Sequence, residues 1–181
     1  MVYIVIGEGF EEIEALAPCD ILRRGGVDTA LAGIGGKYIK GGHGITVEAD
    51  CLVEDIDLND AEMVVFPGGS AGVVSIGESE TAMKKMLEMY ESGKPVAAIC
   101  AAPALLGKLG ILSGREAVCY PGLEDRLDGA VALPDESVVV SGSVITSKAA
   151  GTAVDFGLKL LEVLRGSEAE RAVRESICYR A

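Results

Sequence analysis

Cys100 lies where a short apolar run meets a segment of helical composition. Val96–Ile99 is typical of a buried strand, and residues 101–109 are typical of a helix. A residue at this joint sits in a tight turn at the carboxyl edge of a sheet, where free helix amides favour a thiolate. The pattern indicates a nucleophilic cysteine. The alternative is a small, inert core residue, because free cysteine is often buried.

Glu14 is the carboxylate that we expect to lie next to Cys100 and to exchange protons with it. The sequence predicts a helix over residues 11–24 that starts beside the same sheet edge, and Glu14 falls inside its apolar arc. That arc consists of Ile13, Ala17, Pro18, Ile21 and Leu22. A buried carboxylate is costly unless it is hydrogen-bonded, and burial raises its pKa. A protonated Glu14 would donate a hydrogen bond to the thiolate and later exchange protons, whereas a different helix phase would place Glu14 in solvent.

Two consecutive glycines, Gly68 and Gly69, follow another predicted strand at residues 63–66. Because glycine has no side chain, their backbone N–H groups are able to turn toward a ligand and donate into an oxyanion site. Such glycine pairs also occur in ordinary turns. We expect Gly68 and Gly69 to lie beside Cys100, because the carboxyl ends of parallel strands meet at one edge.

His43 is the sole histidine, within Gly41-Gly-His-Gly44. A cysteine–histidine pair in this chain has no other histidine to use. Glycine-rich surroundings are equally typical of an exposed loop, so we list His43 as an accessory candidate only.

The elements that position these residues alternate between strands and helices. The expected strands are residues 2–6, 27–32, 63–66, 96–99, 116–120, 137–141 and 143–146, with a hairpin excursion over 37–48. The expected helices are 11–24, 78–92, 101–109 and 151–164, followed by a last helix capped by Ser167 in capping-box spacing with Glu170. This order predicts an α/β fold with a mostly parallel sheet and helices on both faces.

Composition narrows the function classes. The length of 181 residues, with 49% apolar residues, suits a single domain over residues 1–181. A formal net charge of −12 disfavours nucleic acid as a partner. The start of the chain has no basic n-region, and its apolar run ends at Glu8, so we expect neither a secretion signal nor a membrane span, and a cytoplasmic protein.

The five cysteines form no C-x-x-C pair, and their number is odd. This pattern fits neither a disulfide framework nor a cysteine zinc site, and one histidine cannot form a histidine-rich centre. We therefore expect reduced thiols, no metal and no organic cofactor.

Several motifs in order resemble the ThiJ/PfpI (DJ-one) superfamily, in particular the branch that holds YajL and the parkinsonism-associated deglycase. The matching segments are Glu11-Glu-Ile-Glu14, Asp20-Ile-Leu-Arg-Arg-Gly-Gly26, Val65-Phe-Pro-Gly-Gly69, Ala97-Ala-Ile-Cys-Ala-Ala-Pro103, Thr146-Ser-Lys148 and Gly151-Thr-Ala-Val-Asp-Phe-Gly157. The resemblance runs nearly from end to end, and the heptad around Cys100 is its most specific part.

This resemblance implies a flavodoxin-like sandwich, similar to class I glutamine amidotransferases, that forms a homodimer. It implies Cys100 as an oxidation-sensitive nucleophile, Glu14 as its protonated partner, and the Gly69 and Ala101 amides as an oxyanion site. The implied activity is glutathione-independent conversion of 2-oxoaldehydes such as methylglyoxal (glyoxalase III), or deglycation of their early adducts, without a cofactor. The alternative is a redox-sensing stress-response protein or chaperone that uses oxidation of the same cysteine.

The chain departs from the family pattern at several places. Tyr120 stands where the deglycase has a histidine before a proline, and Ala149-Ala150-Gly151 replaces a Gly-Pro-Gly loop. His43 replaces an arginine near the family's dimer interface, so it is a candidate to reach a neighbouring subunit's pocket. Ala101 rather than histidine follows Cys100, which disfavours the peptidase activity of the PfpI branch.

Overall fold

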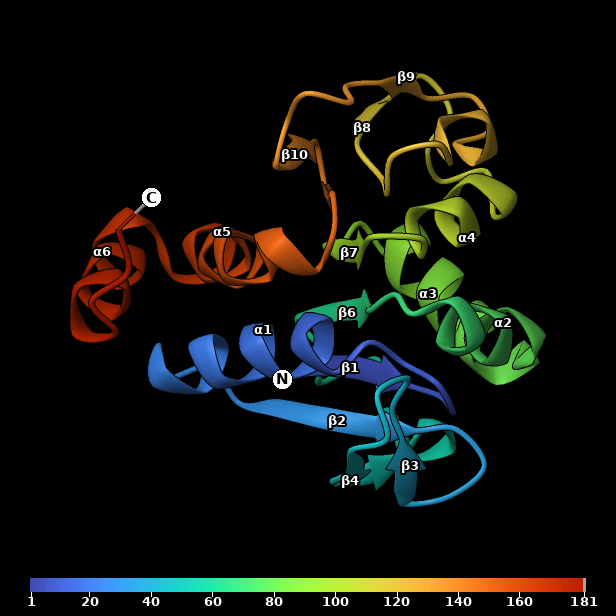
Figure 1. The fold of residues 1–181 in the computed structure, drawn as a ribbon, viewed down its shortest axis with the longest axis horizontal. Coiled ribbons are helices and arrows are strands. Elements are labelled where there is room, and N and C mark those ends of the chain that lie inside the picture. Colours follow the sequence, from blue (N-terminus) through green and yellow to red (C-terminus); the bar gives the residue numbers. More distant parts are fainter. Residues whose placement is uncertain (181) are drawn as a thin grey trace.

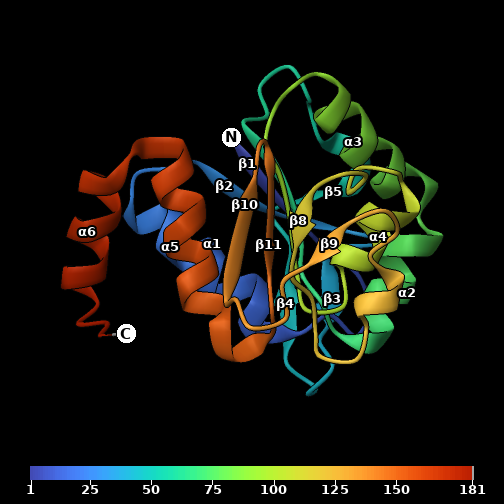
Figure 2. The same ribbon diagram turned by 90° about the horizontal axis from the view of Figure 1, so that it is seen from above.

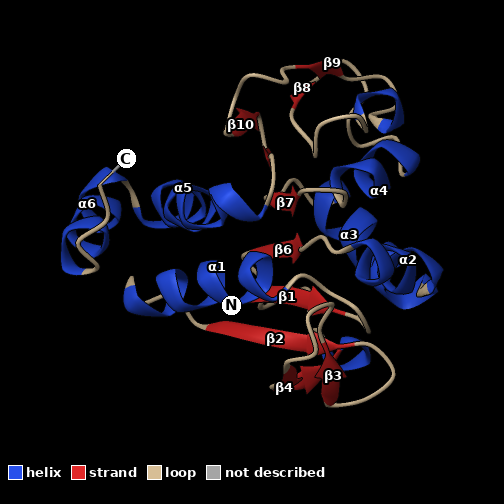
Figure 3. Ribbon diagram, viewed as in Figure 1, coloured by secondary structure: helices blue, strands red, loops and turns tan. Residues whose placement is uncertain are grey.

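The centre of the structure is a seven-stranded, mostly parallel sheet in the order β10-β11-β7-β6-β1-β2-β5 (Figure 1, Figure 3). The computed structural model describes residues 1–180. The strands of this sheet are β1 (Val2–Ile6), β2 (Thr29–Gly33), β5 (Cys51–Leu52), β6 (Met63–Phe66), β7 (Val96–Ile99), β10 (Val138–Ser141) and β11 (Val144–Ser147). Only the edge strand β10 is antiparallel to its neighbour. The predicted α/β fold is confirmed, and β1, β6 and β7 begin and end where the sequence predicts.

Helices cover both faces of the sheet, as seen from above in Figure 2. Helices α1 and α5 pack on one face, with α6 packed against α5, and α2, α3 and α4 pack on the other face. Their bounds are α1 (Glu12–Arg24), α2 (Ser70–Glu78), α3 (Glu80–Glu91), α4 (Pro103–Lys108), α5 (Ala153–Arg165) and α6 (Ser167–Ser176). Among residues 1–180, none of these helices combines the length and the apolar character that a membrane crossing requires.

Strand β1 shows why the apolar runs are continuous. Tyr3 and Val5 point into the core under α2, α3 and α4, while Val2, Ile4 and Ile6 point into the core under α1 and α5. Because both faces are covered, neither set of alternating side chains meets water, and the strand has no polar positions.

Two small sheets lie outside the main one. Strands β3 (Tyr38–Lys40) and β4 (Thr46–Glu48) form the predicted hairpin excursion. Strands β8 (Glu116–Ala117) and β9 (Val131–Ala132) pair in parallel. The predicted strand over 116–120 is therefore too long. Beyond β8 the backbone turns to other partners, because the Val118 amide donates to Thr146 Oγ1 and the Tyr120 amide donates to the Cys100 carbonyl.

The segment after β6 differs from the prediction of one helix over 78–92. Helix α2 already begins at Ser70 and ends at Glu78, and Ser79 separates it from α3 by accepting a bond from the Ala82 amide. Glycine and β-branched residues give α2 a low helix propensity, so its helical form depends on packing, including contact of Gly72 with Phe10.

The predicted Ser167 cap is also wrong. Gly166 precedes α6, and no side chain caps that helix. Three short 3₁₀ turns complete the fold: η1 (Val53–Asp55), η2 (Glu124–Arg126) and η3 (Ala150–Thr152).

Helices α1 and α5 approach closely at Gly157. A Cβ atom at this position would lie 2.9 Å from the Pro18 Cα and 2.9 Å from the Ile21 Cδ1 atom. We expect Gly157→Ala to lower the free energy of unfolding by up to about 2 kcal/mol, since overpacking costs about 1–3 kcal/mol and alanine returns about 1 kcal/mol of helix propensity. Urea unfolding measures the change. Gly151→Ala is the matched control because a Cβ there meets nothing within 4 Å. Equal effects of the two substitutions would contradict the close packing of α1 on α5.

Candidate active site

Cys100 is the residue between β7 and the turn that leads into α4. Its φ of 66° is in the left-handed region, where Cys100 and Cys178 are the only non-glycine residues among the described part of the chain. The surrounding backbone holds Cys100 in this conformation. The Cys100 amide donates to the Ser147 carbonyl at 2.9 Å, and the Cys100 carbonyl accepts from the Tyr120 amide at 2.8 Å. Strain that neighbours enforce in this way is typical of functional turns, where it directs a side chain out of the regular strand.

Glu14 reaches Cys100 from the first turn of α1. Only 1% of the Glu14 surface is exposed, so the predicted burial of this carboxylate is confirmed. Its Oε2 atom accepts a hydrogen bond from the Gly68 amide at 2.9 Å, and its carboxyl group lies close enough to the Cys100 side chain for the two groups to shift each other's pKa. The bond from the Gly68 amide compensates part of the desolvation of the carboxyl group. The expected contact between Glu14 and Cys100 is therefore present.

Gly68 is packed between the two side chains. A Cβ atom on Gly68 would lie 2.5 Å from Glu14 Oε2, 2.7 Å from Cys100 Cβ and 3.2 Å from the Cys100 sulfur. Any side chain at this position would push the carboxyl group and the sulfur apart. Glycine is thus required here by the close approach of the backbone to the pair, and the Gly68 amide orients Glu14 rather than binding the sulfur.

The backbone amides of Gly69 and Ala101 lie close enough to the Cys100 sulfur to lower the pKa of its thiol. Gly69 has a φ of 91°, and a Cβ atom there would lie 2.5 Å from the Gly9 carbonyl oxygen. The tight turn therefore presents an amide that a larger residue could not present. Helix α4 begins only at Pro103 and has six residues, so it contributes less to the site than the predicted helix over 101–109 would. The turn, more than the helix, supplies the donors.

Burial raises the pKa of Glu14 from 4.5 to about 7. The hydrogen bonds from the Cys100 side chain and the Gly68 amide act in the opposite direction, and the negative charge of Glu11 adds to the increase. Desolvation dominates because almost no water reaches the carboxyl group. Glu14 consequently keeps its proton up to about neutral pH, as its expected role as a hydrogen-bond donor requires.

Burial also raises the pKa of the Cys100 thiol to about 12, together with the negative charge and hydrogen bond of ionised Glu14. The amides of Ala101 and Gly69 lower the pKa by less. The expectation that the amides and the positive end of the helix favour a thiolate is therefore not met while Cys100 faces an ionised carboxylate. A thiolate at Cys100 requires the proton to stay on Glu14, because the pair carries a single negative charge most easily when one proton is shared between its two members.

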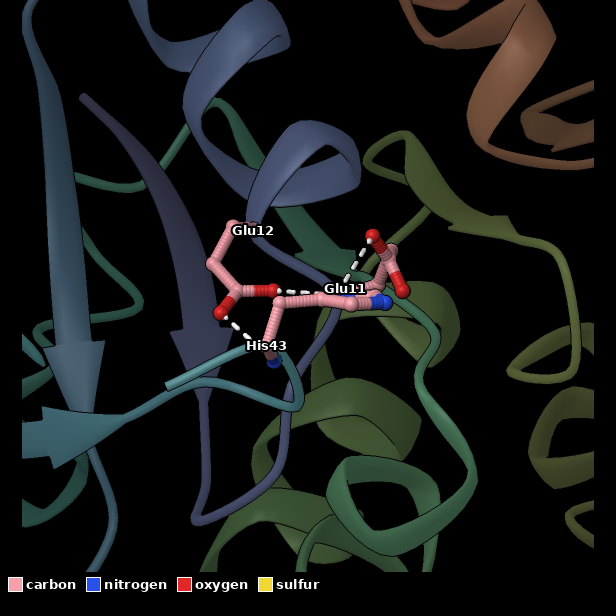
Figure 4. A group of neighbouring side chains, drawn as sticks. All are labelled: Glu11, Glu12 and His43. Carbon is pink, nitrogen blue, oxygen red and sulfur yellow. Dashed lines mark hydrogen bonds and ion pairs between the residues drawn. The ribbon is translucent and has the colours of Figure 1, made fainter. Parts of the chain in front are cut away.

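The two accessory candidates occupy different places. Tyr120 is anchored next to Cys100 through its backbone amide, and its side chain is half exposed. His43 lies in the turn between β3 and β4, where its Nδ1 atom is 3.0 Å from Glu12 Oε2 and 3.4 Å from Glu11 Oε1 (Figure 4). A hydrogen bond to Glu12 and the charges of both carboxylates raise the pKa of His43. Within residues 1–180, this histidine pairs with these carboxylates and not with Cys100.

Sequence reasoning missed Glu12 and misplaced Ile13. Glu12 is buried, and burial raises the pKa of its carboxyl group, but the hydrogen bonds from the His43 side chain and from the backbone leave that pKa below its usual value. Ile13, which the helical pattern assigns to the core, is 54% exposed. The buried face of α1 is formed by Glu14, Ala15, Pro18, Cys19, Ile21 and Leu22, so the predicted apolar arc was centred too far toward Ile13. Two consecutive acidic residues ahead of an apolar run were the available signal for Glu12.

Two hollows are lined by sequence neighbours of the pair. One, of about 530 Å³, is lined by Ala101 and Ser70, the residues that follow Cys100 and Gly69, together with Lys108, Leu123 and Arg126. The other, of about 450 Å³, is lined by Glu11, Glu12, Ile13, His43, Ile45 and Ala150. The first is large enough for a small organic molecule, but neither hollow has Cys100 or Glu14 among its lining residues.

Comparison with known proteins places this geometry in a family. The sequence model of the DJ-1/PfpI family matches residues 1–163. The glutathione-independent glyoxalase DJR-1.2 of Caenorhabditis elegans is 32% identical over 172 residues, covering 94% of this chain and 91% of that protein. A deglycase of Pyrococcus abyssi is 31% identical over 165 residues, covering 91% and 99%. The solved structure of oxidized Toxoplasma gondii DJ-1 superposes with a TM-score of 0.93 at 31% identity, covering 99% and 98%. The chain belongs to the DJ-1/PfpI family.

Proposed function

We propose that this chain is a cysteine-dependent, glutathione-independent enzyme that converts 2-oxoaldehydes such as methylglyoxal, or their early adducts, into 2-hydroxy acids. The observation that carries the proposal is the position of the Cys100 sulfur, which lies with the buried Glu14 carboxyl group around Gly68 and whose pKa is shifted by that carboxyl group and by the Gly69 and Ala101 amides. The names of the worm glyoxalase and the archaeal deglycase support this reaction class.

The first step is attack of the Cys100 thiolate on the aldehyde carbon of the substrate. A carbon–sulfur bond forms, the carbonyl π bond breaks, and the oxygen gains a negative charge that the Gly69 and Ala101 amides stabilise. Glu14 then donates its proton to that oxygen, and the product is a hemithioacetal. The raised pKa of Glu14 serves this step because the carboxyl group still holds a proton near neutral pH.

The second stage moves hydrogen within the adduct. The carboxylate of Glu14 removes the proton from the former aldehyde carbon to give an enediol, and the proton returns to the neighbouring carbon to give a thioester. Water then cleaves the carbon–sulfur bond and releases the 2-hydroxy acid, while the thiol of Cys100 is restored. The aldehyde carbon is oxidised and the ketone carbon is reduced within one molecule, so the reaction consumes only water.

A product assay tests this proposal. Purified protein is incubated with methylglyoxal in the absence of glutathione, and methylglyoxal loss and lactate formation are measured together. We expect many equivalents of lactate for each chain, with one lactate formed for each methylglyoxal consumed. Protein alkylated at Cys100 with iodoacetamide is the control. Loss of methylglyoxal without lactate, at no more than a few equivalents for each chain, would show that the protein only forms adducts.

Redox sensing is the second candidate function. The same hydrogen bonds that hold a thiolate would also hold a Cys100 sulfinate, with Glu14 as the donor. The relative from Toxoplasma gondii was solved in an oxidized form. Mass spectrometry after mild peroxide treatment separates the two functions. Selective double oxygenation of Cys100 together with negligible turnover would favour sensing over catalysis.

A homodimer, a cytoplasmic location and a single domain over residues 1–181 remain predictions. The last residue of that range, Ala181, lies outside the described residues.

A further inference from the structure

Three potential ligand atoms meet beside the N-terminal end of α1, in the cluster drawn in Figure 4. Glu11, Glu12 and His43 each offer one ligand atom, and these three atoms lie within 4.8 Å of one another. The Nδ1 atom is 3.0 Å from Glu12 Oε2 and 3.4 Å from Glu11 Oε1. In a tetrahedral zinc site with bonds of about 2.0–2.2 Å, the ligand atoms stand about 3.3–3.6 Å apart. The cluster is therefore close to the spacing that a bound ion requires.

The surrounding backbone fixes the most buried of these ligands. Glu12 is only 4% exposed, and its Oε1 atom accepts hydrogen bonds from the amides of His43 at 2.8 Å and Ile45 at 3.3 Å. These bonds leave Oε2 directed at the imidazole. Gly41 packs so closely on the carboxyl group that a Cβ atom there would lie 2.3 Å from Oε1. Supporting hydrogen bonds and packing of this kind hold a metal-binding carboxylate in one orientation.

In the single chain, the other side of the cluster is open. The His43 side chain is 71% exposed, and the hollow of about 450 Å³ lined by Ile13, Ile45 and Ala150 adjoins all three ligands. An ion therefore has a route from solvent and room to keep water in its remaining coordination positions. The net charge of −12 adds a long-range attraction for cations.

A proton on Nδ1 satisfies this cluster only in part, because one N–H bond points at one carboxylate at a time. An ion at the centre bonds to both carboxylates and to the nitrogen together. We propose that Glu11, Glu12 and His43 form a binding site for a divalent transition-metal ion such as Zn²⁺, with water as the further ligand. The imidazole binds in its neutral form, so any proton on Nδ1 passes to the buffer when the ion enters. The site includes neither Cys100 nor Glu14 and does not depend on the proposed activity, although the charge of Glu11 also acts on Glu14.

Calorimetric titration of the chelator-treated full chain with zinc chloride at neutral pH tests the site. We expect one strongly bound ion for each chain. His43→Ala and Glu11→Gln should each weaken binding by at least about tenfold, because each removes one of three protein ligands. Glu48→Gln is the matched control. Glu48 is an exposed carboxylate on β4 of the same hairpin, so this variant loses the same charge without losing a ligand and should bind as the wild type does.

Thiols also bind zinc, so the titration is repeated on protein whose accessible cysteines have been alkylated with iodoacetamide. Binding that persists after alkylation and weakens in the His43 and Glu11 variants supports the site. Binding that disappears on alkylation would place the ion on cysteines and overturn the proposal. Equal affinity of the wild type, His43→Ala and Glu11→Gln would overturn it as well. Circular dichroism of each variant checks that the fold is intact.

Discussion

Replacing Cys100 with serine is expected to lower the rate of methylglyoxal turnover by at least about 10³-fold. A serine hydroxyl ionises far less readily than a thiol, and Glu14 is placed to share a proton with sulfur at the longer bond lengths that sulfur makes. The Gly69 and Ala101 amides remain in Cys100→Ser, so the variant separates the nucleophile from the oxyanion donors. The measurement is kcat/KM for methylglyoxal loss at neutral pH.

Cys178→Ser is the matched control for this substitution. Cys178 is an exposed cysteine that also has a positive φ, but it follows α6 and belongs to no part of the site. We expect its turnover to equal that of the wild type. Comparable rates for Cys100→Ser and the wild type would remove Cys100 from the mechanism. Near-ultraviolet circular dichroism of both variants excludes a loss of folding as the cause of low activity.

Replacing Glu14 with glutamine should lower kcat/KM by about 10²–10⁴-fold, the usual contribution of a general acid or base. Glutamine keeps an oxygen that accepts from the Gly68 amide and gains an N–H group that donates to the sulfur, so the site retains its shape. It cannot exchange a proton with the adduct. The wild-type pH–rate profile should therefore have a limb near pH 7, where Glu14 titrates, and this limb should be absent in Glu14→Gln.

Glu14→Gln should lower activity but raise the free energy of unfolding above pH 7. A carboxyl group whose pKa is about 7 in the folded protein and 4.5 in the unfolded chain binds more protons when folded, so stability falls as pH rises between these values. At about 1.4 kcal/mol for each pH unit, the loss is about 3 kcal/mol above pH 7. Glu14→Gln avoids this loss. Urea unfolding should show that the variant is more stable than the wild type above pH 7 and equally stable below pH 4.5.

Glu91→Gln, which removes an exposed carboxylate at the end of α3, is the control for both measurements. It should change neither the pH–rate profile nor the pH dependence of stability. A Glu14→Gln variant with undiminished turnover would show that Glu14 only positions the sulfur. A variant whose stability followed the wild type at every pH would show that Glu14 is ionised in the folded protein at neutral pH.

Much of the fold followed from local pattern. Strands β1, β6 and β7 were predictable to the residue because they are buried on both faces and their apolar runs are bounded by turn residues. The bounds of helix α2 could not be predicted, because its glycines and valines disfavour a helix in isolation. It forms where Gly72 and Ile76 pack against the rest of the molecule, which is information held by distant residues rather than by the segment itself.

The sequence by itself determined which groups meet at the sheet edge. The order of strands and helices carried Cys100, Gly68 and Gly69 to one edge, and the helical period carried Glu14 toward the core, because both periodicities are set by backbone geometry.

Only the tertiary structure decided the pKa values of Glu14 and Cys100 and brought Glu11, Glu12 and His43 together. The raised pKa values of Glu14 and Cys100 depend on how completely the folded chain excludes water from both groups. The pairing of His43 with Glu11 and Glu12 depends on where the β3–β4 turn lands on α1. Neither the pKa values nor this ion pairing can be predicted from the spacing of nearby residues, because desolvation and charge pairing arise only when distant segments pack together.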